Sequence, residues 1–167
     1  SGCAYNTVLC QGNGILNVGD ETRIYHGRWR NVGQKAEDVA THYHAEVALA
    51  TLPRDRWGGL GLNPGVEEGA ICSAPVVVGQ DGAIRINADG VSGLSIDLLD
   101  ERFQPLVGFA GGQVAGPDGL DCLVHWAGKS LAELGGQSVR VQVSIQKTDE
   151  ALPRVYALYL SASEVGS

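Results

Sequence analysis

Histidine, arginine and carboxylate side chains gather in the first third of the sequence, where their spacing could support chemistry. The segment THYHAE places His42, His44 and Glu46 at alternate positions, which is the residue set of a metal site with two histidines and one carboxylate. On a β-strand these side chains share a face, but they lie about 6–7 Å apart and do not converge on one ion. A metal site here is therefore the less favoured functional interpretation.

A carbohydrate-binding cleft is the better functional interpretation of this region. Arginine can bind hydroxyl or carboxylate groups, and tryptophan can stack on the apolar face of a sugar ring. The candidate residues, which we expect at strand ends, are His26, Arg28, Trp29, Arg30, His42 and His44. The alternative is a polar sheet edge without a ligand, in which Trp29 packs against its neighbour.

Carboxylates elsewhere give no candidate catalytic pair of the kind that a glycosidase holds across its sugar. The adjacent acids fall at expected turns, linkers and corners, namely Asp20 with Glu21, Glu67 with Glu68, and Asp100 with Glu101. We therefore assign no catalytic residue. No cofactor is expected, although calcium bound by Asp118 and Asp121 in the loop FAGGQVAGPDGLD is an alternative to a plain Gly-Pro-Asp-Gly turn.

Composition excludes several classes of partner. The chain has 167 residues and a formal net charge of −7 without a basic cluster, so neither nucleic acid nor an anionic membrane is an expected partner. No apolar run reaches the roughly 18 residues of a membrane-spanning helix. Methionine is absent, so we expect a processed form or a piece of a longer protein.

The four cysteines are too few and too irregularly spaced for a disulfide scaffold or a zinc site. We expect single buried thiols, because free cysteine packs as a small hydrophobe. The alternative is a Cys3–Cys10 bridge in a secreted or periplasmic protein. The sequence therefore does not decide between a compartment that keeps the thiols free and a secreted or periplasmic location.

Alternating apolar and polar residues predict short half-buried strands through the rest of the chain. The pattern is found in AIRINADG, LSIDLLDE and SVRVQVSIQ, and further strands are expected at 74–78, 122–126 and 154–160. Such strands must bury their dry faces against each other, so we predict an antiparallel, jelly-roll-like β-sandwich over residues 66–167. Trp126, Phe103 and Phe109 are expected to be anchored in it, and Ser130 and Gly135 to bound one helical turn.

Residues 1–57 are predicted to form a separate three-stranded β-meander, followed by a linker at 58–65. A lone three-stranded sheet has an apolar face with nothing to cover it, so this part needs a neighbour. Trp57, which follows LPRDR, is expected to pack at the junction of the meander and the sandwich. The whole chain is thus predicted to be all-β.

Three long segments carry a resemblance that covers nearly the whole chain: GNGILNVGDETRIYHGRWRN, EVALATLPRDRWGGLGL and SAPVVVGQDGAIRINADGVSGLSIDLLDERFQPLVGF. Together they resemble the C-terminal part of bacterial glycoside-hydrolase-like proteins, in which a five-bladed β-propeller of the family 32 and 43 type precedes a β-sandwich. The chain departs from that pattern at YHGRW, at RDRWGGL and at DERFQPLVGF. The resemblance implies that the meander is part of the last propeller blade.

This resemblance implies a non-catalytic portion of a parent glycosidase, which braces the propeller and contacts carbohydrate. Its expected partners are carbohydrate and the remaining propeller blades, or a second chain. One alternative is an autonomous carbohydrate-binding module, which needs a cleft with exposed aromatic rings. The other is an oligomerisation domain that binds no sugar and completes its sheet with a second copy.

Overall fold

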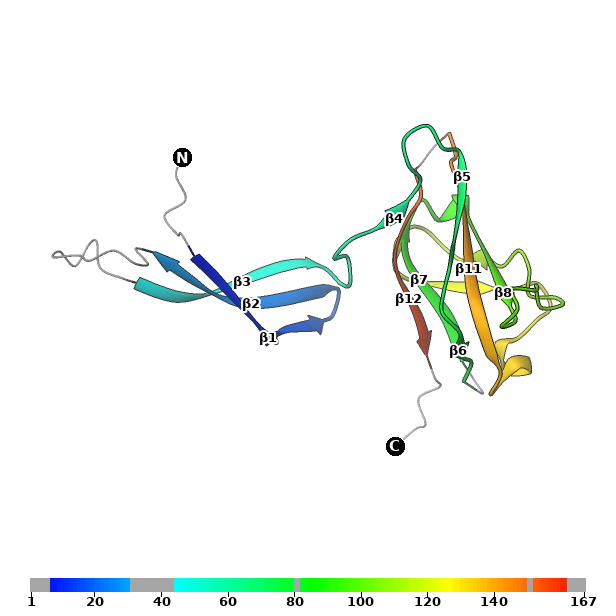
Figure 1. Ribbon diagram of the computed structural model, residues 1–167, viewed down its shortest axis with the longest axis horizontal. Coiled ribbons are helices and arrows are strands. Elements are labelled where there is room, and N and C mark those ends of the chain that lie inside the picture. Colours follow the sequence, from blue (N-terminus) through cyan, green and yellow to red (C-terminus); the bar gives the residue numbers. More distant parts are fainter. Residues whose placement is uncertain (1–6, 31–43, 80–81, 150–151, 162–167) are drawn as a thin grey trace. The chain divides into compact units, whose positions relative to one another are not determined.

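The computed structural model describes residues 7–30, 44–79, 82–149 and 152–161, with side chains described from residue 14 to residue 160. It divides the chain into two compact units, Ser1–Arg56 and Trp57–Ser167. The predicted fold class is confirmed, because a three-stranded antiparallel meander is followed by further antiparallel sheets (Figure 1). Within the described ranges, no helix is long and apolar enough to cross a bilayer.

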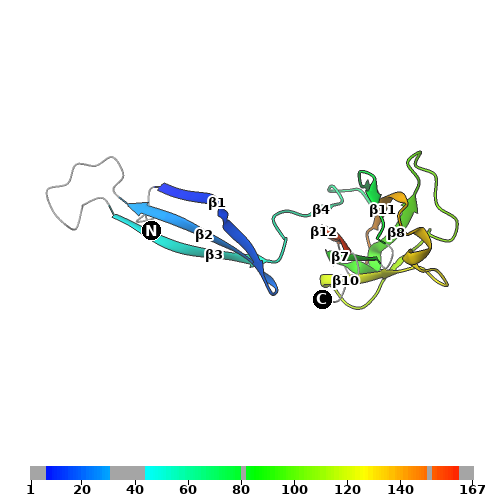
Figure 2. The same cartoon turned by 90° about the horizontal axis from the view of Figure 1, so that it is seen from below.

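The first unit is one antiparallel sheet in the order β1-β2-β3, seen in Figure 2. Its strands are β1 (Thr7–Val18), β2 (Glu21–Arg30) and β3 (His44–Pro53). Gly19 lies at φ 59 in the two-residue turn between β1 and β2, where a tight hairpin needs a positive φ. Thr22 ties the end of the sheet together, because its hydroxyl donates to Asn17 Oδ1 at 2.6 Å and accepts from the Asp55 amide at 2.9 Å.

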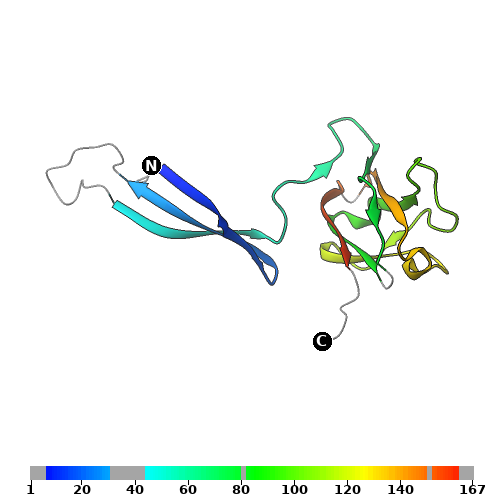
Figure 3. The ribbon, with the colours of Figure 1, turned by 60° about the horizontal axis from the view of Figure 1, so that its bottom comes forward.

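The second unit contains two antiparallel sheets. The strands of the first follow the order β4-β12-β7-β10-β9, with bounds Leu60–Gly61, Arg154–Ser161, Ala83–Asp89, Gly119–His125 and Gln113–Val114. The strands of the second follow the order β5-β11-β6 with β8 also paired to β11, and their bounds are Glu68–Cys72, Ser138–Gln146, Val76–Val77 and Leu94–Leu99. Two 3-10 turns complete the unit, η2 (Val91–Gly93) and η3 (Leu131–Leu134), the latter visible as the gold coil in Figure 3.

Buried aliphatic side chains from both sheets form one core in the second unit. β7 contributes Ile84 and Ile86, β8 contributes Ile96 and Leu98, and β11 contributes its alternate residues Val139, Val141, Val143 and Ile145. Because successive side chains of a strand point to opposite faces, Ser95 and Asp97 of β8 and the intervening residues of β11 face outward.

The aromatic anchors and the linker differ in part from the sequence predictions. Trp126 is 5% exposed and Phe109 is buried beside it, as predicted. Phe103 is 56% exposed and lies under the Arg140 guanidinium at 4.2 Å, so its predicted anchoring is wrong. Trp57 is 58% exposed, and β4 lies within the segment expected to be a linker.

The helical turn predicted in SLAELGG is confirmed as η3. Ser130 caps it, and the Ser130 hydroxyl and the Glu133 carboxylate form a reciprocal capping box. The hydrogen bond from Lys129, followed by that from the Ser130 amide, holds the pKa of Glu133 below its ordinary value. Among the described thiols, Cys122 is buried as predicted, whereas Cys72 is exposed. Cys3 of the alternative Cys3–Cys10 bridge lies outside the described residues.

Candidate functional site

The charged candidates of the first unit share one face of the β1–β3 sheet. The register places Arg28 opposite Glu46 and Arg30 opposite His44, and directly opposite residues of neighbouring strands point to the same side. His26 alternates with Arg28 along β2 and therefore joins them. We call these five residues the charged face. On it, Arg28 Nη2 donates a hydrogen bond to Glu46 Oε1 within an ion pair.

Trp29 lies on the opposite face, because it falls between Arg28 and Arg30 on the same strand. Its indole ring lies over Gly27: a Cβ atom at Gly27 would be 2.9 Å from Trp29 Nε1. The structure therefore groups four of the six predicted carbohydrate-binding residues and separates Trp29 from them. His42, the remaining candidate, lies outside the described residues.

In the described part of the chain, no group of three or more His, Cys, Asp or Glu residues is arranged to hold a metal ion. The two loop candidates both contact protein groups. The Asp118 carboxylate accepts a hydrogen bond from the Val91 amide at 3.0 Å, and Asp121 pairs with Arg85 at 3.6 Å. These contacts fit carboxylates that hold the loop against β7 and η2.

The face of the sheet that carries Trp29 is mostly apolar and largely exposed, and at its hairpin end it also carries an ion pair between Arg23 and Glu21 at 3.1 Å. Val47 is 81% exposed, and the other exposed apolar residues on this side are Leu16, Val18, Tyr25 and Leu49. The register places Leu49 opposite Tyr25 and Val47 opposite Gly27, so these side chains form one surface over β2 and β3. We call Leu16, Val18, Tyr25, Trp29, Val47 and Leu49 the apolar face.

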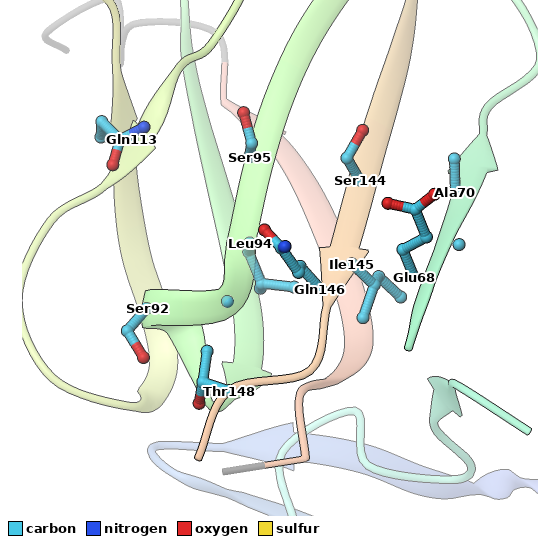
Figure 4. A pocket seen from close by; sticks show the side chains of 12 residues that line it. Glu68, Ala70, Ser92, Leu94, Ser95, Gln113, Ser144, Ile145, Gln146 and Thr148 are labelled. Atoms are coloured by element: carbon cyan, nitrogen blue, oxygen red, sulfur yellow. The ribbon is translucent and has the colours of Figure 1, made fainter. Parts of the chain in front are cut away.

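A polar hollow of about 630 Å³ lies on the second unit, over the outward side of β5, β11 and β8 (Figure 4). Small side chains line its centre. Ser144 of β11 lies opposite Ser95 of β8 on one side and opposite Ala70 of β5 on the other. Longer side chains surround this row of small residues. They include Glu68, Gln113 and Gln146, and Ser92 and Thr148 complete the polar lining.

Sequence reasoning missed the hollow, although it predicted that Ser144 and Gln146 are on the wet side of their strand. The missing information was the pairing, since β11 lies between β5 and β8, which are distant from it in sequence. Glu68 was interpreted as a linker acid, but it begins β5 and pairs with Gln146. The alternation in SVRVQVSIQ is the signal that could have indicated a polar sheet surface.

Comparisons of the chain with protein-family models, with curated proteins and with solved structures found no match. The architecture on its own defines an all-β protein with a three-stranded antiparallel sheet and a second unit of packed antiparallel sheets.

Proposed function

We propose that the chain is the non-catalytic C-terminal portion of a glycoside-hydrolase-like protein. In this role the β1–β3 sheet is part of a propeller blade, and the second unit is an accessory sandwich that contacts carbohydrate. The observation that carries the proposal is the apolar face of the first unit. Blades of a β-propeller are antiparallel sheets arranged around a central channel, so each blade has neighbouring sheets beside it.

Covering the apolar face with another protein surface stabilises the folded protein. Fully burying a valine or leucine side chain stabilises a protein by about 1.5–3 kcal/mol relative to leaving it in water. Val47 is 81% exposed and Leu49 is 49% exposed, so these two side chains alone offer about 3 kcal/mol to a docked neighbour. A neighbouring sheet suits this surface because sheets pack face to face through apolar side chains.

The opposite side of the sheet is less suited to docking. The Arg28–Glu46 ion pair lies there between His26 and Arg30, whereas the Arg23–Glu21 pair of the other side lies at the hairpin end. Dehydrating an ion pair costs free energy that its own attraction does not reliably repay. We therefore assign docking to the apolar face and leave the charged face to solvent or to a polar ligand.

The size of the native protein tests the proposal first. An antibody raised against this chain should detect, in cells that make the native protein, a species far heavier than the 17.5 kDa of these 167 residues. A native species of 17.5 kDa would exclude propeller blades in the same chain and would overturn the proposal.

Paired variants on β3 test the docking surface. Val47→Asp with Leu49→Asp should sharply reduce the yield of folded heavier native protein, whereas Ala48→Asp with Ala50→Asp, on the opposite face of the same strand, should reduce it much less. Sedimentation of the 167-residue chain separates the competing explanation. If the chain forms a stable dimer, and the Val47/Leu49 double variant abolishes it while the Ala48/Ala50 double variant does not, the apolar face serves self-association. That result would overturn the role as part of a blade.

A further inference from the structure

The polar hollow carries groups that are ready to bind a ligand. No described residue provides a hydrogen-bond partner to the side chains of Glu68, Ser95, Ser144 or Gln146, whereas Gln113 Nε2 donates to Gly111 O at 3.1 Å. Hydroxyl and amide groups both donate and accept hydrogen bonds, and an ionised carboxylate accepts only. The hollow thus offers both donors and acceptors across neighbouring strands.

Charge narrows the class of ligand. Among the described residues that line the hollow, Glu68 is the only ionisable side chain, and no cation lies among them. Phosphates, sulfates and acidic sugars are therefore disfavoured, because Glu68 and the net charge of −7 repel them. A metal ion is disfavoured too, since one carboxylate supplies too little of the oxygen shell that a hard cation requires.

The volume of the hollow and the spacing of its polar groups favour a small molecule with many hydroxyl groups. Its volume of about 630 Å³ is within the usual range of ligand sites. The row formed by Ala70, Ser144 and Ser95 crosses three paired strands, which hold it rigidly because neighbouring strands lie about 4.8 Å apart in a fixed ladder. A rigid site with donors and acceptors at this spacing can pair with successive sugar hydroxyls.

We propose that the polar hollow is a binding site for neutral carbohydrate, recognised through hydroxyl groups by Glu68, Ser95, Ser144 and Gln146. This deepens the proposed function, because it places the carbohydrate contact on the sandwich and away from the charged face. No aromatic ring lines the hollow among the described residues, so the stacking that strengthens sugar binding is missing and we expect a dissociation constant in the millimolar range.

Titrations of the 15N-labelled 167-residue chain test this site. Xylo-oligosaccharides and fructo-oligosaccharides are the neutral probes, and galacturonic acid oligosaccharides of similar length are the acidic ones. At about 20 mM, at least one neutral probe should shift the amide signals of Ser95, Ser144 and Gln146, and the acidic probe should not. No shift with either neutral probe, or equal shifts with the acidic probe, would overturn the proposal.

Matched variants locate the binding. Ser144→Val should lower the affinity for the neutral probe at least 10-fold. Ser138→Val, the same change on the same strand outside the hollow, should leave that affinity unchanged. Glu68→Gln should weaken binding of the neutral probe, because a carboxylate accepts stronger hydrogen bonds from hydroxyl groups than an amide does, and it should narrow the difference in affinity between the neutral and acidic probes. Equal affinities for the Ser144 and Ser138 variants, with both spectra still dispersed, would exclude the hollow.

The two proposals can fail separately. Val47→Asp with Leu49→Asp should leave sugar titrations unchanged, because those residues belong to the other compact unit. A chain that binds neutral sugar in the hollow but whose native form weighs 17.5 kDa would retain the hollow as a sugar site and lose the role as part of a propeller protein.

Discussion

Trp126 supports the strand on which the polar hollow is built, and its replacement by phenylalanine has a calculable cost. The indole is 5% exposed, its Nε1 donates to Ile96 O at 3.0 Å, and its ring meets Phe109 edge to face at 5.8 Å. Ile96 lies between Ser95 and Asp97, whose side chains face outward. Trp126→Phe therefore tests the packing directly behind the hollow.

Two losses contribute to the expected destabilisation of Trp126→Phe. The hydrogen bond is worth about 1 kcal/mol net, and Ile96 O is not left bare because it also accepts from the Gly112 amide at 2.7 Å. The phenyl ring also leaves empty the volume of roughly three indole atoms, worth about 2 kcal/mol at ~0.8 kcal/mol per methylene-sized group. We expect a loss of about 3 kcal/mol, or a melting temperature lower by about 10 °C.

Trp57→Phe is the matched control, because the same chemical change falls on a side chain that is 58% exposed. Changes at such sites usually alter stability by no more than about 0.5 kcal/mol. Urea unfolding, followed through the amide signals of β7 and β11, reports on the second unit without a contribution from the first. If the two variants lose the same stability, or if Trp126→Phe loses less than about 1 kcal/mol, Trp126 does not support the strand as we infer.

Two further substitutions test the same unit. Gly112→Ala should lower stability by about 1–3 kcal/mol in a urea titration, because its Cβ would lie 2.5 Å from the Trp126 ring and 2.8 Å from Ile96 O. Glu133, whose pKa the Lys129 hydrogen bond lowers, should contribute stability above its ordinary pKa of 4.5 and lose it as the pH falls through the lower folded value. The melting-temperature difference between wild type and Glu133→Gln should therefore shrink below pH 4.5, and a constant difference would contradict this.

Strand segments of the second unit were predictable where the alternation is long. The segment SVRVQVSIQ coincides with β11. The helical turn predicted between Ser130 and Gly135 coincides with η3. The shorter strands β4, β5 and β9 escaped prediction, because two to five residues are too few to show a period. Phe103 was misplaced because its position depends on the Asp100 turn, in which Asp100 Oδ1 accepts from the amides of Arg102 and Gln104, both at 2.8 Å.

The grouping of the first-unit candidates was only partly predictable. Parity along β2 already separates Trp29 from Arg28 and Arg30, since three consecutive residues of a strand cannot share one face. The facing of Arg28 with Glu46 depends on the register between β2 and β3, which the sequence does not specify over the long connection between them. Polar side chains thus could be identified from sequence, but their partners could not.

The two faces of the first sheet impose different demands on any structure beside it. An apolar face gains free energy in contact with any dry surface of suitable shape, because the hydrophobic effect is non-directional. The Arg28–Glu46 pair gains only from a partner that replaces its lost water with matched hydrogen bonds. We therefore expect a neighbouring sheet of ordinary composition to dock on the side of Val47 and not on the side of Glu46, and this is why the paired aspartate variants on alternate residues of β3 should differ.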